Sequence, residues 1–280
     1  NYDTSIAVAG THGKTTTTSM LSHILLKGEC DPTISVGGIL PAIGGNIRVG
    51  QSETFLTEAC EYTNSFLSFF PTLGIILNMD ADHLDFFKDI DDIRHSFRKF
   101  AELLPADGAL IINADTPKYE MVAENLPCKV ITYGLEHDAE YTASDITYDE
   151  FGHPTFHVLH NGEDIGICSL KVPGIHNVSN ALASIAAGRL LNLDNEVIFA
   201  GLKDFGGTDR RFQYKGKVGE VTIIDDYAHH PTEIEATLHA ANNYPHKKIW
   251  CVFQPHTYTR TKALLPEFAK ALTLADHVVL

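Results

Sequence analysis

The sequence has no long apolar run and no leader of the kind that marks membrane and secreted proteins. Its 280 residues contain no apolar stretch approaching the roughly 20 residues that span a bilayer. The N-terminus shows no basic segment followed by an apolar one. Cysteine is sparse, and the five residues are scattered and free of CxxC spacing, which argues against a disulfide framework or a zinc site. These absences predict reduced thiols and a cytoplasmic protein.

Positive charge is scarce as well. Lys and Arg together number 21 against 36 Asp and Glu, which gives a formal net charge of −15. Proteins that bind nucleic acid gain much of their affinity by neutralising phosphates with Lys and Arg, so this balance argues against a nucleic-acid partner. A phosphorylated ligand needs positive potential built locally, by a loop, a metal ion or a few placed cations.

Both ends of the sequence have the character of a piece of a longer protein. The chain begins at Asn1 without a methionine and stops at Leu280, inside an apolar run that is typical of the start of a strand. A strand that ends without a neighbour leaves backbone groups unpaired. We therefore expect further chain on both sides.

Over the first half of the chain, short apolar runs alternate with longer segments of helical spacing. Strands are predicted at 5–9, 54–57, 73–77 and 109–112, and a helix is predicted ahead of Gly28. This alternation is typical of an α/β fold with a doubly wound, mainly parallel sheet. Between about 129 and 172 the pattern alternates residue by residue and includes the turn signal Asn161-Gly162, which predicts antiparallel ribbons appended to that sheet.

The α/β pattern resumes after the ribbons and then continues into a second unit. A helix is predicted over 177–191, and the Gly206-Gly207 pair with the polar stretch 215–217 suggests a linker. Beyond it we expect a strand over 221–224, a helix from Thr232, a strand over 249–253, a helix to about 273 and a final strand. The sequence thus predicts domains at 1–213 and 214–280, the second a truncated Rossmann-like domain.

The sharpest local motif is the loop Gly10–Thr15, with the sequence GTHGKT between a predicted strand and a predicted helix. Such a loop binds phosphate because its glycines let successive N–H groups converge on an anion, while the lysine adds charge and the hydroxyl of Thr15 can bind Mg²⁺. The usual motif has another glycine at the place of Val8, so this is a shortened form, GxxGKT. It predicts a P-loop.

Carboxylates and polar side chains follow the next predicted strands. Glu58 and Glu61 directly follow a predicted strand. Glu58 is either an ordinary surface charge or a ligand that binds Mg²⁺ directly or through water, because ligands of open α/β sheets lie at the carboxyl ends of strands. The segment Asp80-Ala-Asp82-His83 either holds metal or phosphate, or consists of a capping Asp82 with a hydrogen-bonded His83. Asn177 and Asn180 share a helical face opposite the apolar stripe and serve as an N-cap or read a base edge.

The second unit carries two polar loops after its predicted strands. In the first, 225–233, a capping box of Thr232 and Glu235 explains only part of the polarity. The second, 254–261, is too polar for a simple connector. Arg210-Arg211 before them is either an ordinary surface pair or a clamp that closes on a γ-phosphate. Both loops have the character of substrate-binding elements that face a nucleotide domain.

Seven motifs, in this order along the chain, resemble those of the Mur ligases of peptidoglycan synthesis. They are GTHGKTTTT (10–18), TEACEY (57–62), DADHLD (80–85), PGIHNVSNALASIAA (173–187), GTDRRF (207–212), DDYAHHPTE (225–233) and FQPHTYTRT (253–261). The last two are similar to the alanine-adding members in particular.

The resemblance implies ATP as a ligand and two Mg²⁺ ions, and it assigns roles to residues. Nucleotide-binding residues are Gly10, Thr11, His12, Gly13, Lys14, Thr15, Thr16, His176, Asn177, Asn180, Arg211 and Asp226. Metal ligands are Thr15, Glu58 and His83, and the catalytic set is Lys14, Glu58, His83 and Arg211. The amino-acid substrate is held by Tyr227, His229, His256 and Arg260.

The implied reaction is an ATP-dependent amide-bond formation between UDP-N-acetylmuramate and L-alanine through an acyl phosphate. It also implies an N-terminal UDP-binding domain and the rest of a C-terminal domain outside this sequence. Two alternatives remain open. Another ligase on the same scaffold would recycle muropeptides or extend folate with glutamate. A P-loop nucleotide switch would carry base-reading motifs, which the sequence does not contain.

Overall fold

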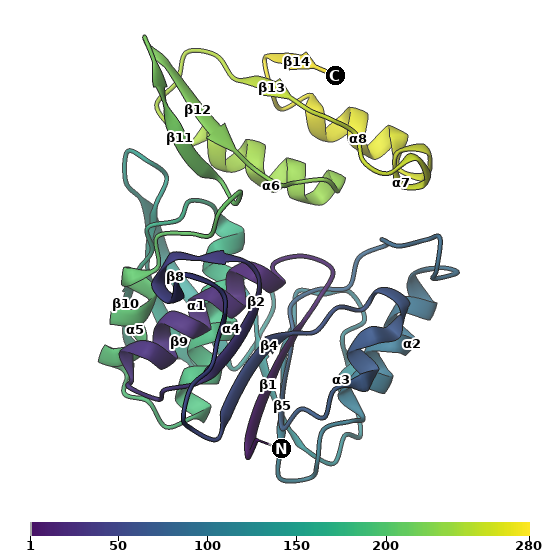
Figure 1. The fold of residues 1–280 in the computed structure, drawn as a ribbon, viewed down its shortest axis with the longest axis vertical. Helices are drawn as coiled ribbons and strands as arrows, with labels where there is room; N and C mark the ends of the chain where they lie inside the picture. Colours follow the sequence, from purple (N-terminus) through teal and green to yellow (C-terminus); the bar gives the residue numbers. More distant parts are fainter. Residues whose placement is uncertain (1) are drawn as a thin grey trace.

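A computed structural model describes residues 2–280 (Figure 1). Within them the strands are β1 (Thr4–Ala9), β2 (Thr33–Leu40), β3 (Gly45–Arg48), β4 (Thr54–Glu58), β5 (Leu73–Ile76), β6 (Ala109–Asn113), β7 (Lys129–Tyr133), β8 (Tyr141–Tyr148), β9 (Pro154–His160), β10 (Glu163–Ser169), β11 (Gln213–Val218), β12 (Val221–Asp225), β13 (Trp250–Val252) and β14 (His277–Val279). The helices are α1 (Lys14–Lys27), α2 (Ile90–Ala101), α3 (Glu120–Ala123), α4 (Ile175–Leu190), α5 (Asn195–Asp204), α6 (Pro231–Asn242), α7 (Tyr258–Ala263) and α8 (Leu265–Leu272), with 3₁₀ turns at Pro41–Ile43 and Tyr62–Ser68. None of these helices combines the length and the apolar character needed to cross a membrane.

A single sheet organises the first part of the chain. Within residues 2–280 it has ten strands in the order β10-β9-β8-β7-β6-β5-β1-β4-β2-β3. The pairs from β8 to β2 along this order are parallel, whereas β10-β9, β9-β8 and β2-β3 are antiparallel. The predicted mainly parallel α/β sheet is confirmed. The predicted hairpin turn at Asn161-Gly162 joins β9 to β10, and both residues have positive φ, as a tight hairpin turn requires.

The predicted antiparallel ribbon is wrong at its start. Residues 129–133 form β7, which pairs in parallel with β6 through the register Ala109↔Lys129. The antiparallel part, β8 to β10, continues the same sheet as its edge. The segment between β6 and β7 is long enough to cross over and return in the same direction, which a short apolar run does not reveal.

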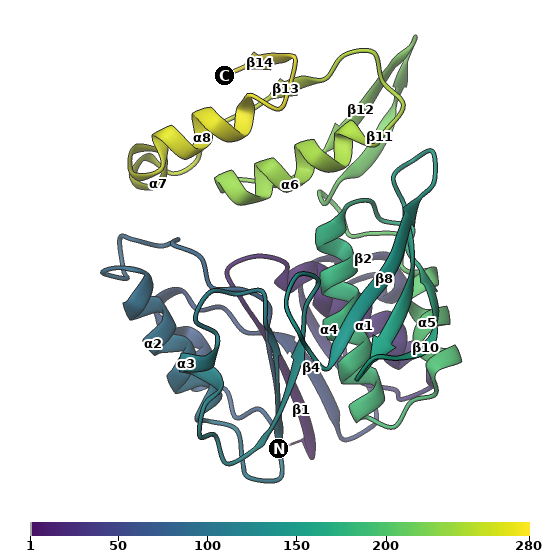
Figure 2. The same ribbon diagram turned by 180° about the vertical axis from the view of Figure 1, so that it is seen from behind.

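Helices cover both faces of this sheet (Figures 1 and 2). Strand β1 shows why, since Ile6 and Val8 pack into the core with α1, α4 and α5, and Ala7 and Ala9 pack into the core with α2. Alternating side chains of a strand point to opposite faces, so a strand that is apolar at every position is buried on both. The sheet is therefore a rigid central layer whose carboxyl edge presents the loops after β1, β4 and β5.

The second unit lies over that carboxyl edge (Figures 1 and 2). It contains the hairpin β11–β12, the parallel pair β13–β14 and helices α6, α7 and α8 around a small core that includes Leu238, Phe253 and Phe268. Two expectations are corrected here. Residues 215–217 are not a linker but lie in β11, paired antiparallel with β12. The segment expected as one helix up to about 273 is divided into α7 and α8.

Candidate active site

The loop between β1 and α1 is held in shape by glycine geometry and by Asn78. Gly10 and Gly13 have φ values of 146° and 84°, a region that favours glycine. A Cβ at Gly10 would also lie 3.0 Å from the Cβ of Leu77. The Asn78 side chain accepts the His12 N–H at 2.8 Å and donates to the His12 carbonyl at 3.1 Å. The loop is thus shaped by the neighbouring strand end as well as by its own sequence.

Lys14 at the start of α1 folds back across the loop. Its ammonium group donates to the carbonyls of Gly10 and Thr11 and to Glu61 Oε2, the last at 2.9 Å. Glu61 is buried, with an exposed fraction of 2%, and its other oxygen has no hydrogen-bond partner among the described residues. That oxygen lies 3.6 Å from His83 Nε2. Glu61 therefore links the phosphate-type loop to His83.

Thr15 and Glu58 bring two oxygen donors together beside the loop. The Thr15 hydroxyl donates to Glu58 Oε2 at 3.1 Å, and the Gly37 N–H on β2 holds the other Glu58 oxygen. A Cβ at Gly37 would lie 2.9 Å from Glu58 Oε2, so glycine leaves room for the carboxylate. Hard oxygen donors that leave positions for phosphate and water fit Mg²⁺. Within residues 2–280 no group of three or more His, Cys, Asp or Glu could enclose a metal.

His83 and Asp82 follow β5. The His83 ring stacks on Tyr62 with centroids 4.4 Å apart, and the His83 N–H donates to Asp82 Oδ1 at 2.7 Å. Asp82 also accepts two hydrogen bonds from Arg260 of the second unit. Burial raises the pKa of Asp82, but the bonds from Arg260 and the nearby His83 outweigh it and lower the pKa to about 2. Asp82 is an anion that joins the two units.

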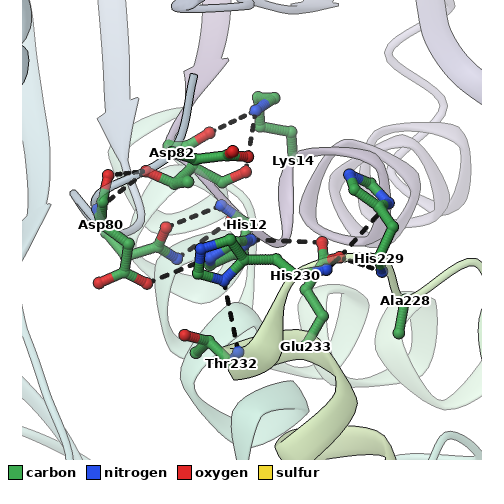
Figure 3. Close-up of polar contacts among 12 residues, drawn as sticks. His12, Lys14, Asp80, Asp82, Ala228, His229, His230, Thr232 and Glu233 are labelled. Carbon is green, nitrogen blue, oxygen red and sulfur yellow. Dashed lines mark hydrogen bonds and ion pairs between the residues drawn. The ribbon is translucent and has the colours of Figure 1, made fainter. Parts of the chain in front are cut away.

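His12 makes a second contact between the units (Figure 3). Its Nε2 lies 3.2 Å from Asp80 and its Nδ1 lies 3.3 Å from Glu233 on α6. Burial alone would lower the pKa of His12, but the carboxylates of Asp80 and Glu233 beside its two ring nitrogens raise it to about 9. The same contacts hold the pKa of Glu233 far below its usual range against the effect of burial. His12 is therefore an imidazolium at neutral pH.

Helix α6 begins with a capping box that differs from the one expected. The N-cap is His230, whose ring accepts the Thr232 N–H at 3.3 Å. The Glu233 carboxylate reaches back to the His229 and His230 N–H groups at 3.0 and 3.3 Å. The predicted pair of Thr232 and Glu235 is wrong, because the N-cap lies two residues earlier, at His230. Capping places Glu233 at the helix end that faces His12.

A cleft of about 410 Å³ opens between the two units. Tyr62 and the loop after β5 form one wall, and His83 lies in it. The residues that we assigned to the amino acid all lie in the cleft wall, namely Tyr227, His229, His256 and Arg260. Asp82 and Arg260, which are 178 positions apart along the chain, thereby meet in the wall of one cleft.

Family models match both units. The model of the Mur ligase middle domain matches residues 8–188, and that of the Mur ligase glutamate ligase domain matches residues 210–280. The chain belongs to the Mur ligase family. The resemblance of the seven motifs is confirmed.

Individual relatives agree with the family match. This Mur ligase chain is 61% identical over all its 280 residues to a UDP-N-acetylmuramate–L-alanine ligase of Agathobacter rectalis, of which it covers 61%. It resembles the crystal structure of UDP-N-acetylmuramate-alanine ligase from Thermotoga maritima with a TM-score of 0.83 and 33% identity, over 98% of this chain and 60% of that one. A murein peptide ligase from Psychrobacter arcticus gives a TM-score of 0.75 and 28% identity, over 98% and 62%. The chain spans about three fifths of the length of these relatives.

The asparagines of the Mur ligase chain at the start of α4 differ from expectation. Asn177 and Asn180 are buried rather than turned away from the apolar side, and the N-cap is Gly174, without a side-chain bond. Asn177 donates to the Pro173 carbonyl at 2.7 Å, and Asn180 donates to Asn177 at 3.2 Å. A Cβ at Gly13 would lie 2.9 Å from Asn180 Oδ1, which puts Asn180 beside the phosphate-type loop.

The other residues of the Mur ligase chain that we predicted to bind nucleotide are spread over both units. Arg211 lies 3.9 Å from Glu233, its guanidinium 5.7 Å from the centroid of the Tyr227 ring. Asp226 accepts the Phe212 and Ala228 N–H groups at 2.7 Å each, and burial raises its pKa. His176 is exposed, and Thr11 and Thr16 lie at the loop and the first turn of α1.

Sequence reasoning did not find the contacts of four residues that hold this site together: Glu61, which was placed at the strand end without a partner, Asn78, Asp82 as the partner of Arg260, and Glu233 as the partner of His12. Glu61 had one available signal, since it stands three residues after Glu58 at the same strand end. The other three act through partners 66 to 221 positions away. A local motif does not show such partners.

Proposed function

We propose that this chain is the central and amino-acid-binding part of an ATP-dependent ligase that joins L-alanine to UDP-N-acetylmuramate. The domains are 1–213 for ATP and 214–280 for the start of the amino-acid domain. The observation that carries the proposal is that polar groups of the first unit meet the polar loops of the second. His12 of the phosphate-type loop contacts Glu233, and His83 and Asp82 line one cleft with Arg260. The relative that is 61% identical, and is named for this reaction, supports it.

The first step is the transfer of the ATP γ-phosphoryl group to the substrate carboxylate, which turns a poor leaving group into a good one. The loop N–H groups and Lys14 bind the phosphates, and Lys14 leaves Glu61 to do so. Arg211 lies near Glu233, which contacts His12 of the loop, and it adds a cation for the γ-phosphate. Catalysis here is mainly positioning and charge neutralisation.

Mg²⁺ would be held by Thr15 and Glu58, and a second ion by His83 with the free oxygen of Glu61 at hand. When bound, Mg²⁺ neutralises the phosphate charge that builds up during transfer. Glu58 is oriented for this role by the Gly37 N–H, which occupies one oxygen and leaves the other toward Thr15.

The second step is attack of the alanine amine on the acyl phosphate, which releases phosphate and forms the amide. The amine must lose a proton, and a histidine is suited to accept it near neutral pH. Two histidines of the second unit line the cleft and are candidates for this role, His229 and His256. We place the enzyme in the cytoplasm, where its five free cysteines stay reduced.

A coupled phosphate-release assay tests the function. The full-length protein is supplied with ATP, UDP-N-acetylmuramate and each amino acid in turn, together with a muropeptide and a folate–glutamate pair. We expect phosphate release and one new amide product with L-alanine. Phosphate release with the muropeptide or with folate and glutamate, and none with L-alanine, would show one of the alternative ligases instead. GTP-dependent hydrolysis without an acceptor would show a nucleotide switch.

A further inference from the structure

Arg260 and Asp82 form a bidentate ion pair between the units. Arg260 Nε–H donates to Asp82 Oδ1 at 2.9 Å, and its Nη2 donates to Oδ2 at 3.1 Å. Both side chains are nearly buried, with exposed fractions of 11% and 6%. This parallel geometry matches the guanidinium fork to a carboxylate and fixes orientation as well as distance.

The pair leaves part of the guanidinium available to a ligand. Arg260 has five N–H bonds, of which two go to Asp82 and one, from Nη1, goes to the His256 carbonyl at 3.1 Å. Among the described contacts, one N–H on each terminal nitrogen remains. Arg260 lines the cleft, so a second carboxylate can accept hydrogen bonds from these two nitrogens.

Asp82 is itself fixed by its own element. It lies in the loop after β5, and within that loop its Oδ1 accepts the N–H of the neighbouring His83 at 2.7 Å, which helps to fix the carboxylate. Arginine is otherwise a long, flexible side chain on α7, a short helix of the second unit. A buried ion pair adds little net stability, because desolvation offsets its attraction, so stability alone is a poor explanation for it.

We propose that Asp82 is a positioning residue that orients Arg260 so that its two remaining N–H groups hold the carboxylate of the incoming amino acid. This inference rests on the proposed ligase function and on the role in amino-acid binding that the resemblance gives to Arg260, and it adds the residue that orients this arginine. A carboxylate held at Arg260 leaves the amine at the other end of the amino acid free to attack. Without Arg260, the fixed charge of Asp82 would repel the same carboxylate.

The test is a double-mutant cycle in the full-length ligase. Asp82→Asn keeps the size of the side chain but removes the charge, and we expect it to raise the KM for the amino acid about 10-fold or more. The KM values for ATP and the UDP-sugar should stay within about twofold. Arg260→Lys should also raise the KM for the amino acid. When Asp82→Asn is added to Arg260→Lys, this KM should rise little further, because the two residues act as one unit.

Two further variants separate positioning from stability. Asp91→Asn breaks another Asp–Arg pair, the one with Arg94 within α2, and should leave the amino-acid KM unchanged. Asp82→Glu keeps the carboxylate and should raise the KM less than Asp82→Asn does. Thermal unfolding of each variant checks the fold. If Asp82→Asn does not fold, the cycle is run with Asp82→Glu and Arg260→Lys.

Failure of the positioning role of Asp82 can be distinguished from failure of the proposed ligase reaction. The wild-type enzyme is first given the amino-acid panel, and the accepted amino acid is the one titrated in every variant. Failure of L-alanine as a substrate overturns the proposed reaction alone. An unchanged amino-acid KM in Asp82→Asn, an equal rise in the KM for ATP, or fully additive effects of the two substitutions would overturn the positioning role.

Discussion

The charge of His12 depends on two carboxylates, one from each unit. Its pKa is raised from the ordinary 6.5 to about 9, so its contribution to stability is complete below about 6.5 and is lost as pH rises through about 9. The shift corresponds to about 3 kcal/mol at most. We expect the free energy of unfolding to fall across this interval in the wild type and to fall less in His12→Gln, as measured by denaturant titration at pH 6.5 and 9.5. Equal losses in the two proteins would contradict the assignment.

Lys14 has a structural role besides the proposed catalytic one. It neutralises Glu61, which is buried, so Lys14→Met leaves an unpaired charge and should cost about 3–5 kcal/mol of unfolding free energy. ATP turnover should be lost as well. In Lys14→Met/Glu61→Gln the stability should largely return while turnover stays absent, which chemical denaturation and the phosphate-release assay measure separately. Turnover in the double variant would remove Lys14 from the mechanism.

At the residue scale, the sequence predicts those parts of the site that are contiguous. The loop Gly10–Thr15 was placed correctly because strand, glycine turn and helix follow one another in the chain. The pairs Lys14–Glu61 and Asp82–Arg260 could not be read, since charged partners are chosen by the fold over separations of 47 and 178 residues. The burial of Asn177 was missed because its helix packs on both sides, so polarity did not mark an outer face.

At the element scale, β2 controls the geometry of Glu58 through a glycine. A Cβ at Gly37 would lie 2.9 to 3.2 Å from the Glu58 carboxylate, whose flexible end must then move. We expect Gly37→Ala to raise the Mg²⁺ concentration needed for half-maximal phosphate release several-fold, with little change in the thermal midpoint. Gly45→Ala on β3 is the matched control, because a Cβ there meets nothing within 4 Å. An identical Mg²⁺ requirement in Gly37→Ala would exclude this role of β2.

Elements with a buried alternating or helical pattern were predictable, whereas their pairing was not. Strands β1, β4, β5 and β6 are short apolar runs, and they appear where expected. For β7 the same kind of apolar run does not tell whether the strand pairs in parallel or antiparallel with its neighbour. The connection between β6 and β7 decides this, and the pair is parallel. In β11 the residues Lys215 to Lys217 face solvent on an edge hairpin, so their polarity resembled that of a linker.

At the scale of the whole molecule, several polar contacts join the two units. They include His12 with Glu233, Asp82 with Arg260, and His230 with the Ala81 carbonyl at 3.4 Å. The rings of Phe151 and Tyr244, with centroids 5.6 Å apart, add an aromatic contact. Polar contacts of this kind hold an orientation but permit opening, as interfaces within chains commonly do. The donors proposed for the ATP phosphates, Lys14 and the N–H groups of the loop before α1, come from the first unit. Of the predicted nucleotide-binding residues only Asp226 lies in the second unit, so phosphate binding does not require the contacts to persist.

Because the donors for the phosphates lie in the first unit, we expect the 280-residue chain to bind nucleotide without catalysing the ligation. The chain spans 61% of its relative from Agathobacter rectalis, while the proposed phosphate and metal donors lie within it. We expect calorimetry to show Mg·ATP binding to the isolated chain and chromatography to show no amide product from ATP, UDP-N-acetylmuramate and L-alanine. Lys14→Met/Glu61→Gln, the variant expected to keep its stability, should abolish the binding heat, which ties that heat to the loop between β1 and α1. Product from the isolated chain would mean that the cleft between the two units already contains everything the ligation needs.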